Sequence, residues 1–262
     1  MTQTRSLSQT FEKDWFPHKL ILLSIVGSSA HGLALEGTDD QDEMGICIEG
    51  PEFVIGLEHF EQYITRTKPE GIRSEAGDLD RVVYSARKFC RLALSGNPSI
   101  LTFLFAPSII LMSLGKELQE NAHWFASRSA GKAFLGYMTQ QRQRLLGERG
   151  QMNVKRPELT ERYGFDTKYA MHMLRLGFQG VEFLETGRLT LPMPEPEHSF
   201  ILSVRKGEVE LNEVLTRAGE LEQRVSDLIE TSPLPARPDR EAVNRWLVKA
   251  YRETWDDCAD PP

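Results

Sequence analysis

Leu20-Ile21-Leu22-Leu23-Ser24-Ile25-Val26-Gly27-Ser28-Ser29 is the stretch that decides the fold. The residues before the glycine are mainly aliphatic, which is typical of a short buried strand. The residues that follow, Ser28 to Leu35, predict a short helical segment. Free backbone N–H groups and the helix dipole at the start of such a segment form an anion site. We therefore expect Gly27, Ser28 and Ser29 to contact a phosphate group.

Asp40-Gln41-Asp42 follows this segment and begins a second predicted strand, which continues through Met44–Ile48. Side chains alternate along a strand, so Asp40 and Asp42 point to the same side. Two carboxylates on one face are hard oxygen ligands that suit Mg²⁺ held jointly with substrate phosphates. Asp39 is the neighbouring alternative. Only Asp40 has the i, i+2 relation to Asp42, so we interpret Asp39 as a turn residue.

A third strand is predicted from Leu79 to Tyr84. By the same alternation, Asp80 and Tyr84 share one face of this strand. If the strand lies beside the second one, Asp80 completes a triad with the two earlier carboxylates. A carboxylate in that place would ligate the catalytic metal and help to deprotonate an attacking hydroxyl. Asp78 is the competing candidate for this role.

The composition is that of an ordinary globular protein. Hydrophobic residues make up 40% and charged residues 26% of the 262 residues, so we expect a packed core rather than disorder. The net charge of -7 excludes a generally basic surface, so nucleic acid would need a local positive patch. The cysteines Cys47, Cys90 and Cys258 are scattered, which indicates reduced thiols in a cytoplasmic protein. The apolar run Leu20–Val26 is too short to span a membrane.

We predict two domains from these patterns. Residues 10–112 form an α/β (α+β) domain with a small mixed sheet, and residues 113–262 form a mainly helical domain. Residues 151–164 are polar and basic and predict a loop or a poorly ordered segment, whereas residues 199–206 predict a short strand. Helices are predicted over Pro98–Phe105, within Gly115–Leu146, and over Thr167–Thr186, Val209–Glu230 and Arg240–Trp255.

One predicted helix in the second half carries a polar stripe at the spacing i, i+4, i+7 and i+11. The stripe consists of Lys168, His172, Arg175 and Gln179. By periodicity alone, a stripe of this kind is usually a solvated face. The alternative interpretation is that its cations contact phosphate groups.

These patterns together resemble the DNA polymerase beta-type nucleotidyltransferase superfamily. They are more similar still to its branch of predicted nucleotidyltransferases associated with RNA repair pathways. The resemblance runs from about Leu20 to Glu208 and implies a nucleotidyltransferase domain followed by helices. The stretches that carry it are Gly27–Ala34, Thr38–Gly45, Tyr84–Phe89, Gly96–Pro98, Lys168–Leu176 and Leu184–Gly187.

The sequence departs from the pattern of that branch at three positions, and none of them removes a metal carboxylate. His31 stands where the branch often has an aromatic residue. Thr102 stands where an acidic residue often follows the Asn-Pro pair, and Met44 replaces a more usual basic residue.

The resemblance implies an enzyme that transfers a nucleoside monophosphate from a nucleoside triphosphate to a hydroxyl and releases pyrophosphate. It favours Asp80 over Asp78, and its cofactor would be Mg²⁺ or Mn²⁺. The acceptor is an RNA end, a protein hydroxyl or a small molecule, because the fold does not fix it. A non-catalytic nucleotide-binding or regulatory protein on the same fold is the alternative. The implied metal ligands and catalytic residues are Asp40, Asp42 and Asp80, and the implied nucleotide-binding residues are Gly27, Ser28, Ser29, Lys168, His172 and Arg175.

Three further features have two interpretations each. His31 is either a nucleotide contact or a packed or exposed histidine. Arg87-Lys88 begins a helix and is either a phosphate contact or a solvated helix start. The basic segment from Arg142 to Arg162 is either a solvated loop or a nucleic-acid contact. The sequence does not specify the oligomeric state, and we expect no association with a membrane.

Overall fold

The aliphatic stretch of the opening motif forms β1 (Lys19–Ile25), one strand of a five-stranded sheet with the order β3-β4-β2-β1-β5. The structure is a computed structural model that describes residues 18–35, 41–68, 77–148 and 156–259. The side chains at Ile21, Leu22 and Leu23 are fully buried, which explains why this stretch is continuously apolar. The other strands are β2 (Gln41–Ile48), β3 (Gln62–Arg66), β4 (Leu79–Ser85) and β5 (Ser108–Leu111).

The sheet is mixed, as the sequence predicts. β2 lies at its centre and pairs antiparallel with β1 and parallel with β4. β3 pairs antiparallel with β4, and β5 pairs antiparallel with β1, so these two strands form the edges. The strands predicted at β1, β2 and β4 are confirmed, whereas the two edge strands were not predicted.

In the first half of the chain, helices follow the strands after short connections. Most helices in the second half are longer than those in the first half. Asp166 caps the start of α9 by accepting hydrogen bonds from the backbone N–H groups of Lys168 and Tyr169, and Gly187 ends the helix in a left-handed conformation. The helices are α2 (Gly27–His31), α3 (Pro51–Val54), α4 (Ala86–Leu94), α5 (Pro98–Phe105), α6 (Ser113–Glu120), the 3₁₀ helix η1 (Ala122–Phe125), α7 (Ala130–Leu145), α8 (Pro157–Tyr163), α9 (Thr167–Thr186), α10 (Glu197–Lys206), α11 (Leu211–Thr231) and α12 (Arg240–Ala259).

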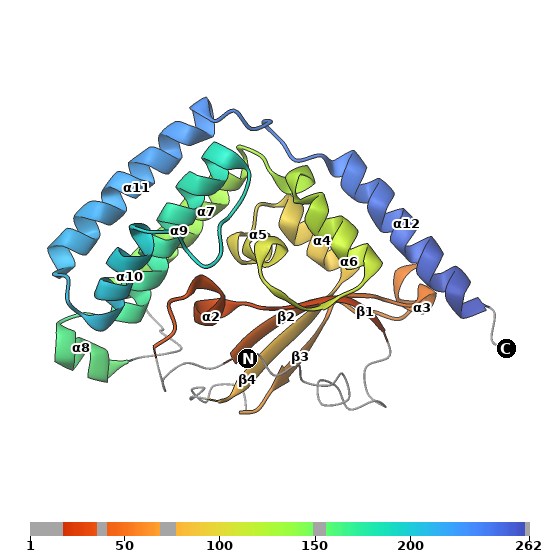
Figure 1. Cartoon of the computed structure of the whole chain (residues 1–262), viewed down its shortest axis with the longest axis horizontal. Helices are drawn as coiled ribbons and strands as arrows, with labels where there is room; N and C mark the ends of the chain where they lie inside the picture. Colours follow the sequence, from red (N-terminus) through yellow and green to blue (C-terminus); the bar gives the residue numbers. More distant parts are fainter. Residues whose placement is uncertain (1–17, 36–40, 69–76, 149–155, 260–262) are drawn as a thin grey trace.

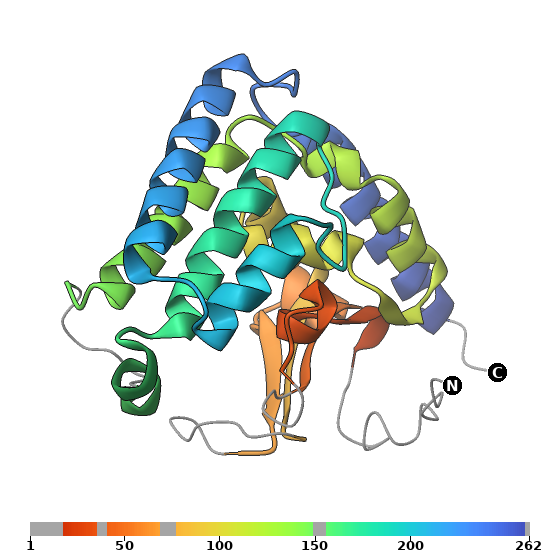
Figure 2. The same cartoon turned by 60° about the vertical axis from the view of Figure 1, so that its left-hand side comes forward.

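The helices are arranged in two groups around the sheet. In Figure 1, α4, α5 and α6 lie above the sheet, while α7, α9, α10 and α11 form a group beside it. Figure 2 brings this second group to the front, where α9 runs between its neighbours. One hydrophobic core connects the two groups, because it includes Leu22 of β1, Phe103 of α5, Met173 of α9 and Leu221 of α11. The division into two domains at residue 112 stays a prediction.

Two predictions for the second half are wrong. Residues 199–206 were predicted as a strand, but they lie in α10, whose Ile201 and Val204 are fully buried at the i, i+3 spacing of a helix. Residues 151–164 were predicted as a loop, but Pro157–Tyr163 forms α8, with proline at its first turn and Gly164 as a left-handed C-cap. Of that segment, residues 151–155 lie outside the described residues.

The C-terminal helix is attached to the sheet through a buried carboxylate. Glu49 follows β2 and is fully buried. The hydroxyl of Tyr251 in α12 donates to Glu49 Oε1 at 2.7 Å, and the backbone N–H of Ala86 donates to Oε2 at 3.2 Å. The indole N–H of Trp255 donates to the Glu49 carbonyl oxygen at 3.0 Å. These hydrogen bonds place α12 against the end of β2. None of the helices in the described ranges combines the length and apolar composition that crossing a bilayer requires.

Candidate functional site

Asp42 and Asp80 lie side by side in the sheet. They are Cα partners in the parallel pairing of β2 with β4, and neighbouring strands are about 4.8 Å apart. Both residues line the same pocket. The third predicted strand therefore lies beside the second, which is the arrangement that the proposed carboxylate triad requires. Asp40 lies outside the described residues, so its part in the triad stays a prediction.

Gly27 lies directly against the carboxylate of Asp42. The glycine has a φ of +67°, and a Cβ atom built on it would be 2.0 Å from Asp42 Oδ2. The backbone N–H of Val26 donates to the carbonyl oxygen of Asp42 at 2.9 Å. A residue with a side chain would therefore both strain the backbone and displace the carboxylate. This contact explains why the turn after β1 requires glycine.

The pocket that contains these residues has a volume of about 290 Å³. Of the residues predicted to bind substrate or metal, Gly27, Asp42, Asp80 and Arg175 line it, and Arg175 reaches it from α9. Its lining residues are Val26, Gly27, His31, Asp42, Glu43, Met44, Arg66, Asp80, Val82, Ser99, Thr102 and Arg175. Segments far apart in the sequence thus meet at this pocket.

Four other predicted residues do not line the pocket. Ser28 and Ser29 follow Gly27 in α2, where Ser28 is half-buried and Ser29 is exposed. α2 has only five residues, so few peptide dipoles add up at its N-terminus, where the sequence predicts an anion site. Lys168 and His172 lie on α9, on the N-terminal side of Arg175, and both are half-buried.

The sequence departs from the pattern of the similar family branch at three positions, and all three of these residues line the pocket. His31 is buried, and Met44 follows Asp42 on the same face of β2. Thr102 is buried in α5, and its hydroxyl donates to the carbonyl oxygen of Pro98 at 2.8 Å. The substitutions therefore change the lining of the pocket rather than a remote surface.

The pocket also contains residues that the sequence analysis missed. Arg66 of β3 is the Cα partner of Asp80, and its Nε lies 3.8 Å from Asp80 Oδ1. Ser99 lies in the first turn of α5, two residues after Asn97, whose side chain caps the helix. The Asn97-Pro98 pair is a sequence signal for the start of a helix, and it could have pointed to Ser99 in the first turn. Arg66 had no such signal, because the segment that contains β3 shows no clear period.

Asp78 contacts residues that do not line the pocket. Its Oδ1 accepts a hydrogen bond from the hydroxyl of Thr67 at 2.9 Å, and Lys68 Nζ lies 3.3 Å from its Oδ2. Asp78 does not line the pocket, whereas Asp80 does. The geometry therefore favours Asp80 over Asp78 as the functional carboxylate.

A buried ion pair fixes the two strands that carry the carboxylates. Glu43 and Arg81 are the register partners next to Asp42 and Asp80, and both side chains are less than a tenth exposed. Arg81 Nε donates to Glu43 Oε2 at 2.7 Å, and Arg81 Nη2 lies 2.6 Å from the same oxygen. Gln41 Nε2 donates to Glu43 Oε1 at 2.6 Å. These contacts hold β2 and β4 in register at the pocket.

The carboxylates fit a magnesium ion that is shared with a substrate. Mg²⁺ is usually bound by one or two carboxylates together with substrate phosphates and water, and Asp42 and Asp80 supply two such ligands in one pocket. The absence of a Cβ at Gly27 leaves room for the carboxylate of Asp42. In the described part of the chain, no group of three or more His, Cys, Asp or Glu side chains is arranged to hold a metal ion. Asp40, which lies outside the described residues, stays the predicted third ligand.

His31 connects α2 with α9 at the edge of the pocket. Its Nε2 lies 2.5 Å from Arg175 Nη1, and its Nδ1 lies 3.3 Å from Gln179 Nε2. Burial, together with the nearby positive charge of Arg175 and the neighbouring His172, holds the pKa of His31 well below its ordinary value. Burial lowers the pKa of Arg175 to about 10, so the guanidinium is charged at neutral pH while the imidazole is neutral.

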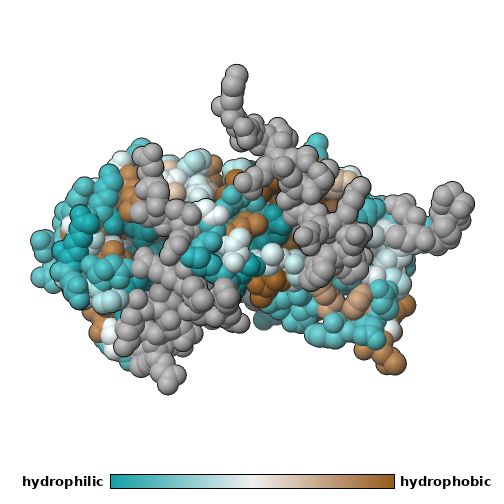
Figure 3. Space-filling model, turned by 90° about the horizontal axis from the view of Figure 1, so that it is seen from below, coloured by the Kyte–Doolittle hydropathy of each residue, from teal (hydrophilic) through white to brown (hydrophobic). Residues whose placement is uncertain are grey.

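Several cations surround His172 on the N-terminal half of α9. Burial is the main cause of a pKa well below the ordinary value for His172, followed by the charges of Arg175, Lys168, Arg205 and Arg156. Arg156 also pairs with Asp166, with Nη1 3.0 Å from Oδ2. Figure 3 shows the molecule from below, where the end that holds α8 is predominantly hydrophilic. These cations are a local positive feature of a chain with a net charge of -7.

The remaining cations considered in the sequence lie elsewhere. Lys88 Nζ is 2.9 Å from Glu61 Oε2, and Arg87 donates to the carbonyl oxygen of Phe53 at 3.5 Å. In the basic segment, Arg142 makes two hydrogen bonds to the carboxylate of Glu222, at 2.9 and 3.1 Å. None of these cations lines the pocket. Residues 149–155 of the basic segment lie outside the described residues.

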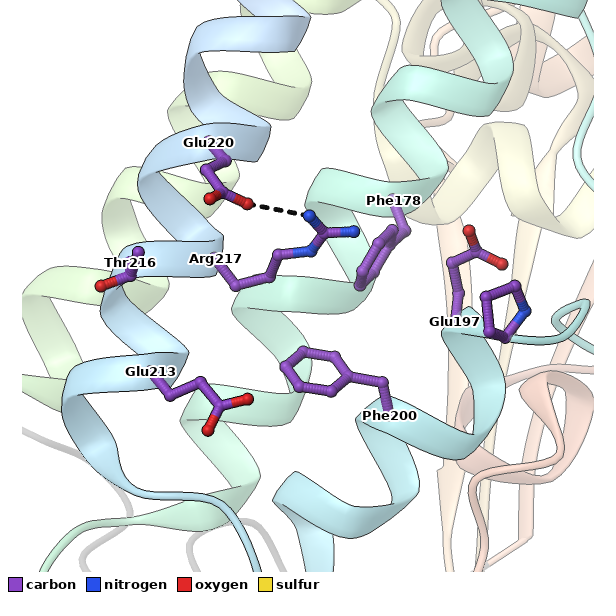
Figure 4. Close-up of a pocket in the computed structure, with 8 residues that line it drawn as sticks. Phe178, Glu197, Phe200, Glu213, Thr216, Arg217 and Glu220 are labelled. Atoms are coloured by element: carbon purple, nitrogen blue, oxygen red, sulfur yellow. Dashed lines mark hydrogen bonds and ion pairs between the residues drawn. The ribbon is translucent and has the colours of Figure 1, made fainter.

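A larger cavity of about 420 Å³ lies between α9, α10 and α11 and contains none of the predicted site residues. Figure 4 shows the rings of Phe178 and Phe200 on one side of it and the side chain of Arg217 reaching toward Phe178. The Arg217 guanidinium carbon is 5.3 Å from the centre of the Phe178 ring, and its Nη1 is 2.8 Å from Glu220 Oε2. The smaller pocket is the candidate site because it contains the paired carboxylates.

Similarity to known proteins identifies the family of the chain. The sequence model of RlaP, the RNA repair pathway DNA polymerase beta family, matches residues 2–249. No curated protein matches the chain. A solved nucleotidyltransferase-like protein from Exiguobacterium sibiricum 255-15 is 12% identical, and the match covers 94% of this chain and 79% of that one, with a TM-score of 0.32. At that TM-score the likeness carries no argument about the fold or the site. The family match spans most of the chain, and the protein therefore belongs to the RNA repair pathway DNA polymerase beta family, a group of nucleotidyltransferases.

Proposed function

We propose that the protein transfers a nucleoside monophosphate from a nucleoside triphosphate to an acceptor hydroxyl, with Mg²⁺ or Mn²⁺ as the cofactor. The observation that carries the proposal is the placement of Asp42 and Asp80 on paired positions of β2 and β4, in a pocket that also contains Gly27 and Arg175. Paired carboxylates opposite a cation suit a substrate that brings both phosphate groups and a metal.

In this proposal Asp40, Asp42 and Asp80 hold the metal, which when bound supplies positive charge that stabilises the oxygens around the α-phosphorus. Asp80 accepts the proton of the acceptor hydroxyl, and the oxygen of that hydroxyl forms a bond to the α-phosphorus. The bond from the α-phosphorus to the oxygen that bridges to the β-phosphate breaks. Pyrophosphate leaves with the electron pair of that bond.

The phosphate chain of the nucleotide is held from two sides. Gly27, Ser28 and Ser29 contribute backbone N–H groups and hydroxyls from α2, although only Gly27 lines the pocket. On the other side, Arg175 contributes a guanidinium that lines the pocket. Lys168 and His172 continue the same helix away from Arg175, and we assign them to the phosphate groups that extend beyond the pocket.

We propose an RNA end as the acceptor. The name of the family supports this choice, and the cations around His172 concentrate positive charge beside Arg175 in a chain whose net charge is negative. A protein hydroxyl and a small molecule are the other acceptors that the test below distinguishes. The buried free thiols Cys47 and Cys90 support a reducing, cytoplasmic location.

The test is a screen of the four nucleoside triphosphates, each labelled at the α-phosphate, with purified protein, Mg²⁺ or Mn²⁺, and total RNA or total protein. We expect label to appear in RNA with at least one nucleotide. Label in protein or in a small molecule would mean that RNA is not the acceptor, while the proposed nucleotidyl transfer would still hold. Binding of a nucleotide without transfer to any acceptor would instead identify a non-catalytic nucleotide-binding protein.

A further inference from the structure

The buried imidazole of His31 lies between two side chains of α9. Its two ring nitrogens face Arg175 Nη1 and Gln179 Nε2. Arg175 Nη1 also donates to Gln179 Oε1 at 3.1 Å. His31 itself is the last residue of α2, four positions after Gly27, so the two residues lie on one side of this helix. The network therefore connects the glycine turn beside Asp42 to the helix that supplies the cation.

The network has more hydrogen-bond donors than acceptors. A guanidinium only donates, so Nε2 of the neutral His31 ring must accept from Arg175, and the ring proton is then on Nδ1. The group that faces Nδ1 is the amide nitrogen of Gln179, which is also a donor. If the amide were turned, its oxygen would accept from Nδ1, but its nitrogen would face Arg175 instead. One N–H group lacks an acceptor in either orientation.

Arg175 has a further donor without an acceptor, and its charge lacks a carboxylate partner among the described residues. Its Nε is buried and has no hydrogen-bond partner in the described part of the chain. Among the described residues, no carboxylate forms an ion pair with its guanidinium, which contacts His31 and Gln179. An arginine with a purely structural role is normally paired with a carboxylate when it is partly withdrawn from water. The guanidinium lines the pocket that contains Asp42 and Asp80, where an anionic ligand would supply it with an acceptor.

We propose that His31 is a positioning residue that holds the guanidinium of Arg175 at the wall of the pocket, where Arg175 binds a phosphoryl oxygen of the nucleotide. The ring acts through Arg175 and does not itself touch the substrate. A neutral imidazole suits this task because it offers Arg175 an acceptor without neutralising its charge. A carboxylate in the same place would form an ion pair and compete with the phosphate. This inference rests on the proposed function, since it assigns the anion to the nucleotide.

The test is a double-mutant cycle on the binding of inorganic tripolyphosphate and of ATP, each measured by calorimetry with Mg²⁺ present. Replacing His31→Phe removes the acceptor and keeps a ring, whereas His31→Gln keeps an acceptor. A hydrogen bond to a charged group predicts that His31→Phe weakens tripolyphosphate binding by about tenfold or more, and His31→Gln restores most of it. Arg175→Gln should weaken binding at least as much, with Arg175→Lys as a second variant if the first does not fold.

The diagnostic result is non-additivity. If His31 acts through Arg175, adding His31→Phe to Arg175→Gln changes the affinity little further. Equal losses from His31→Phe in both backgrounds, or wild-type affinity in His31→Phe, would overturn the proposal. His198→Phe is the matched control, because His198 contacts the Gly32 carbonyl oxygen and not Arg175. Thermal melts show which variants are folded.

The two proposals fail in different ways. If the wild-type protein binds tripolyphosphate and shows the coupling but transfers no label to any acceptor, the proposed reaction fails and the positioning role stands. If label is transferred but the two substitutions act independently, the positioning role fails and the reaction stands. A wild-type protein that binds neither tripolyphosphate nor ATP overturns the positioning role, whatever the outcome of the label-transfer screen.

Discussion

Gly27→Ala should damage both the stability of the protein and the position of Asp42. The φ of +67° places residue 27 in the left-handed region, where a residue with a Cβ costs about 1–2 kcal/mol. The new methyl group would also lie 2.0 Å from Asp42 Oδ2 and 2.8 Å from Asp42 Cγ, so the carboxylate must move. Overpacking of this kind costs about 1–3 kcal/mol. The total expected loss in the free energy of unfolding is about 2–5 kcal/mol.

Gly147→Ala is the matched control for this substitution. Gly147 has a similar φ of +71°, but a Cβ built there has no heavy atom of the described residues within 4 Å. The control should therefore show the backbone strain alone, about 1–2 kcal/mol. The difference between the two variants measures the contact with Asp42.

Urea unfolding gives the free energies of both variants, and a Mn²⁺ titration followed by electron paramagnetic resonance reports on the carboxylates. We expect Gly27→Ala to lose more stability than Gly147→Ala, and to bind Mn²⁺ more weakly than either the control or the wild type. If Asp42 rotates away, the stability difference shrinks but the loss of Mn²⁺ affinity remains. Equal stability losses together with wild-type Mn²⁺ affinity would refute the reasoning.

Three further predictions concern contacts around the site. Glu43→Gln leaves the buried Arg81 without its counter-charge, so urea unfolding should show a loss of about 3–5 kcal/mol; a loss under about 1 kcal/mol would argue against a buried pair. Tyr251→Phe removes a donor to the buried Glu49 carboxylate and should cost about 1–3 kcal/mol; an unchanged melting temperature would contradict the attachment of α12. Hydrogen bonding to a backbone carbonyl, and further to a glutamate, raises the pKa of His198. The contribution of protonated His198 to the free energy of unfolding is therefore complete below the unfolded-state pKa. It is lost as the pH rises through the higher folded-state pKa. The unfolding free energy of the wild type should fall relative to that of His198→Gln as the pH rises above about 6.5, the ordinary pKa of histidine, and parallel pH profiles would refute this.

The sequence predicts the centre of the fold better than its edges. The aliphatic run of β1 is buried on both faces, and such strands are apolar throughout, so their residues alone identify them. β3 and β5 are edge strands of five and four residues with few buried positions. β5 pairs with β1, which is distant in sequence, whereas β3 pairs with β4, the next strand along the chain; local composition specifies neither pairing.

α10 shows how tertiary packing decides an ambiguous segment. Its apolar residues are close together, so a short strand and a helix are both compatible with the sequence. Ile201 and Val204 are buried in the core that α10 shares with α9, and Gly207 ends the helix in a left-handed conformation. The glycine was a readable stop signal, whereas the packing partner was not.

Some residues of the candidate site were predictable from the sequence and others were not. Gly27 and Asp42 were predictable from the motif that follows the first strand, and Asp80 from the strand that carries it together with the family resemblance. Arg175 was predictable as part of a helical stripe, although periodicity alone favoured a solvated face. Its half-buried position in the structure results from the packing of α9 against the helices around it. Arg66 comes from an unpredicted edge strand and had no sequence signal.

The central claim is that the pocket lined by Asp42 of β2 and Asp80 of β4 carries out metal-dependent nucleotidyl transfer. The most direct measurement compares label transfer from an α-labelled nucleoside triphosphate with Mg²⁺ in Asp42→Asn, Asp80→Asn and the control Asp78→Asn. We predict that the two pocket variants lose at least about a hundredfold in rate while their melting temperatures stay close to that of the wild type. Asp78→Asn should retain transfer, because Asp78 contacts Thr67 and Lys68 outside the pocket. Undiminished transfer in both pocket variants, or an equal loss in the control, would contradict the claim.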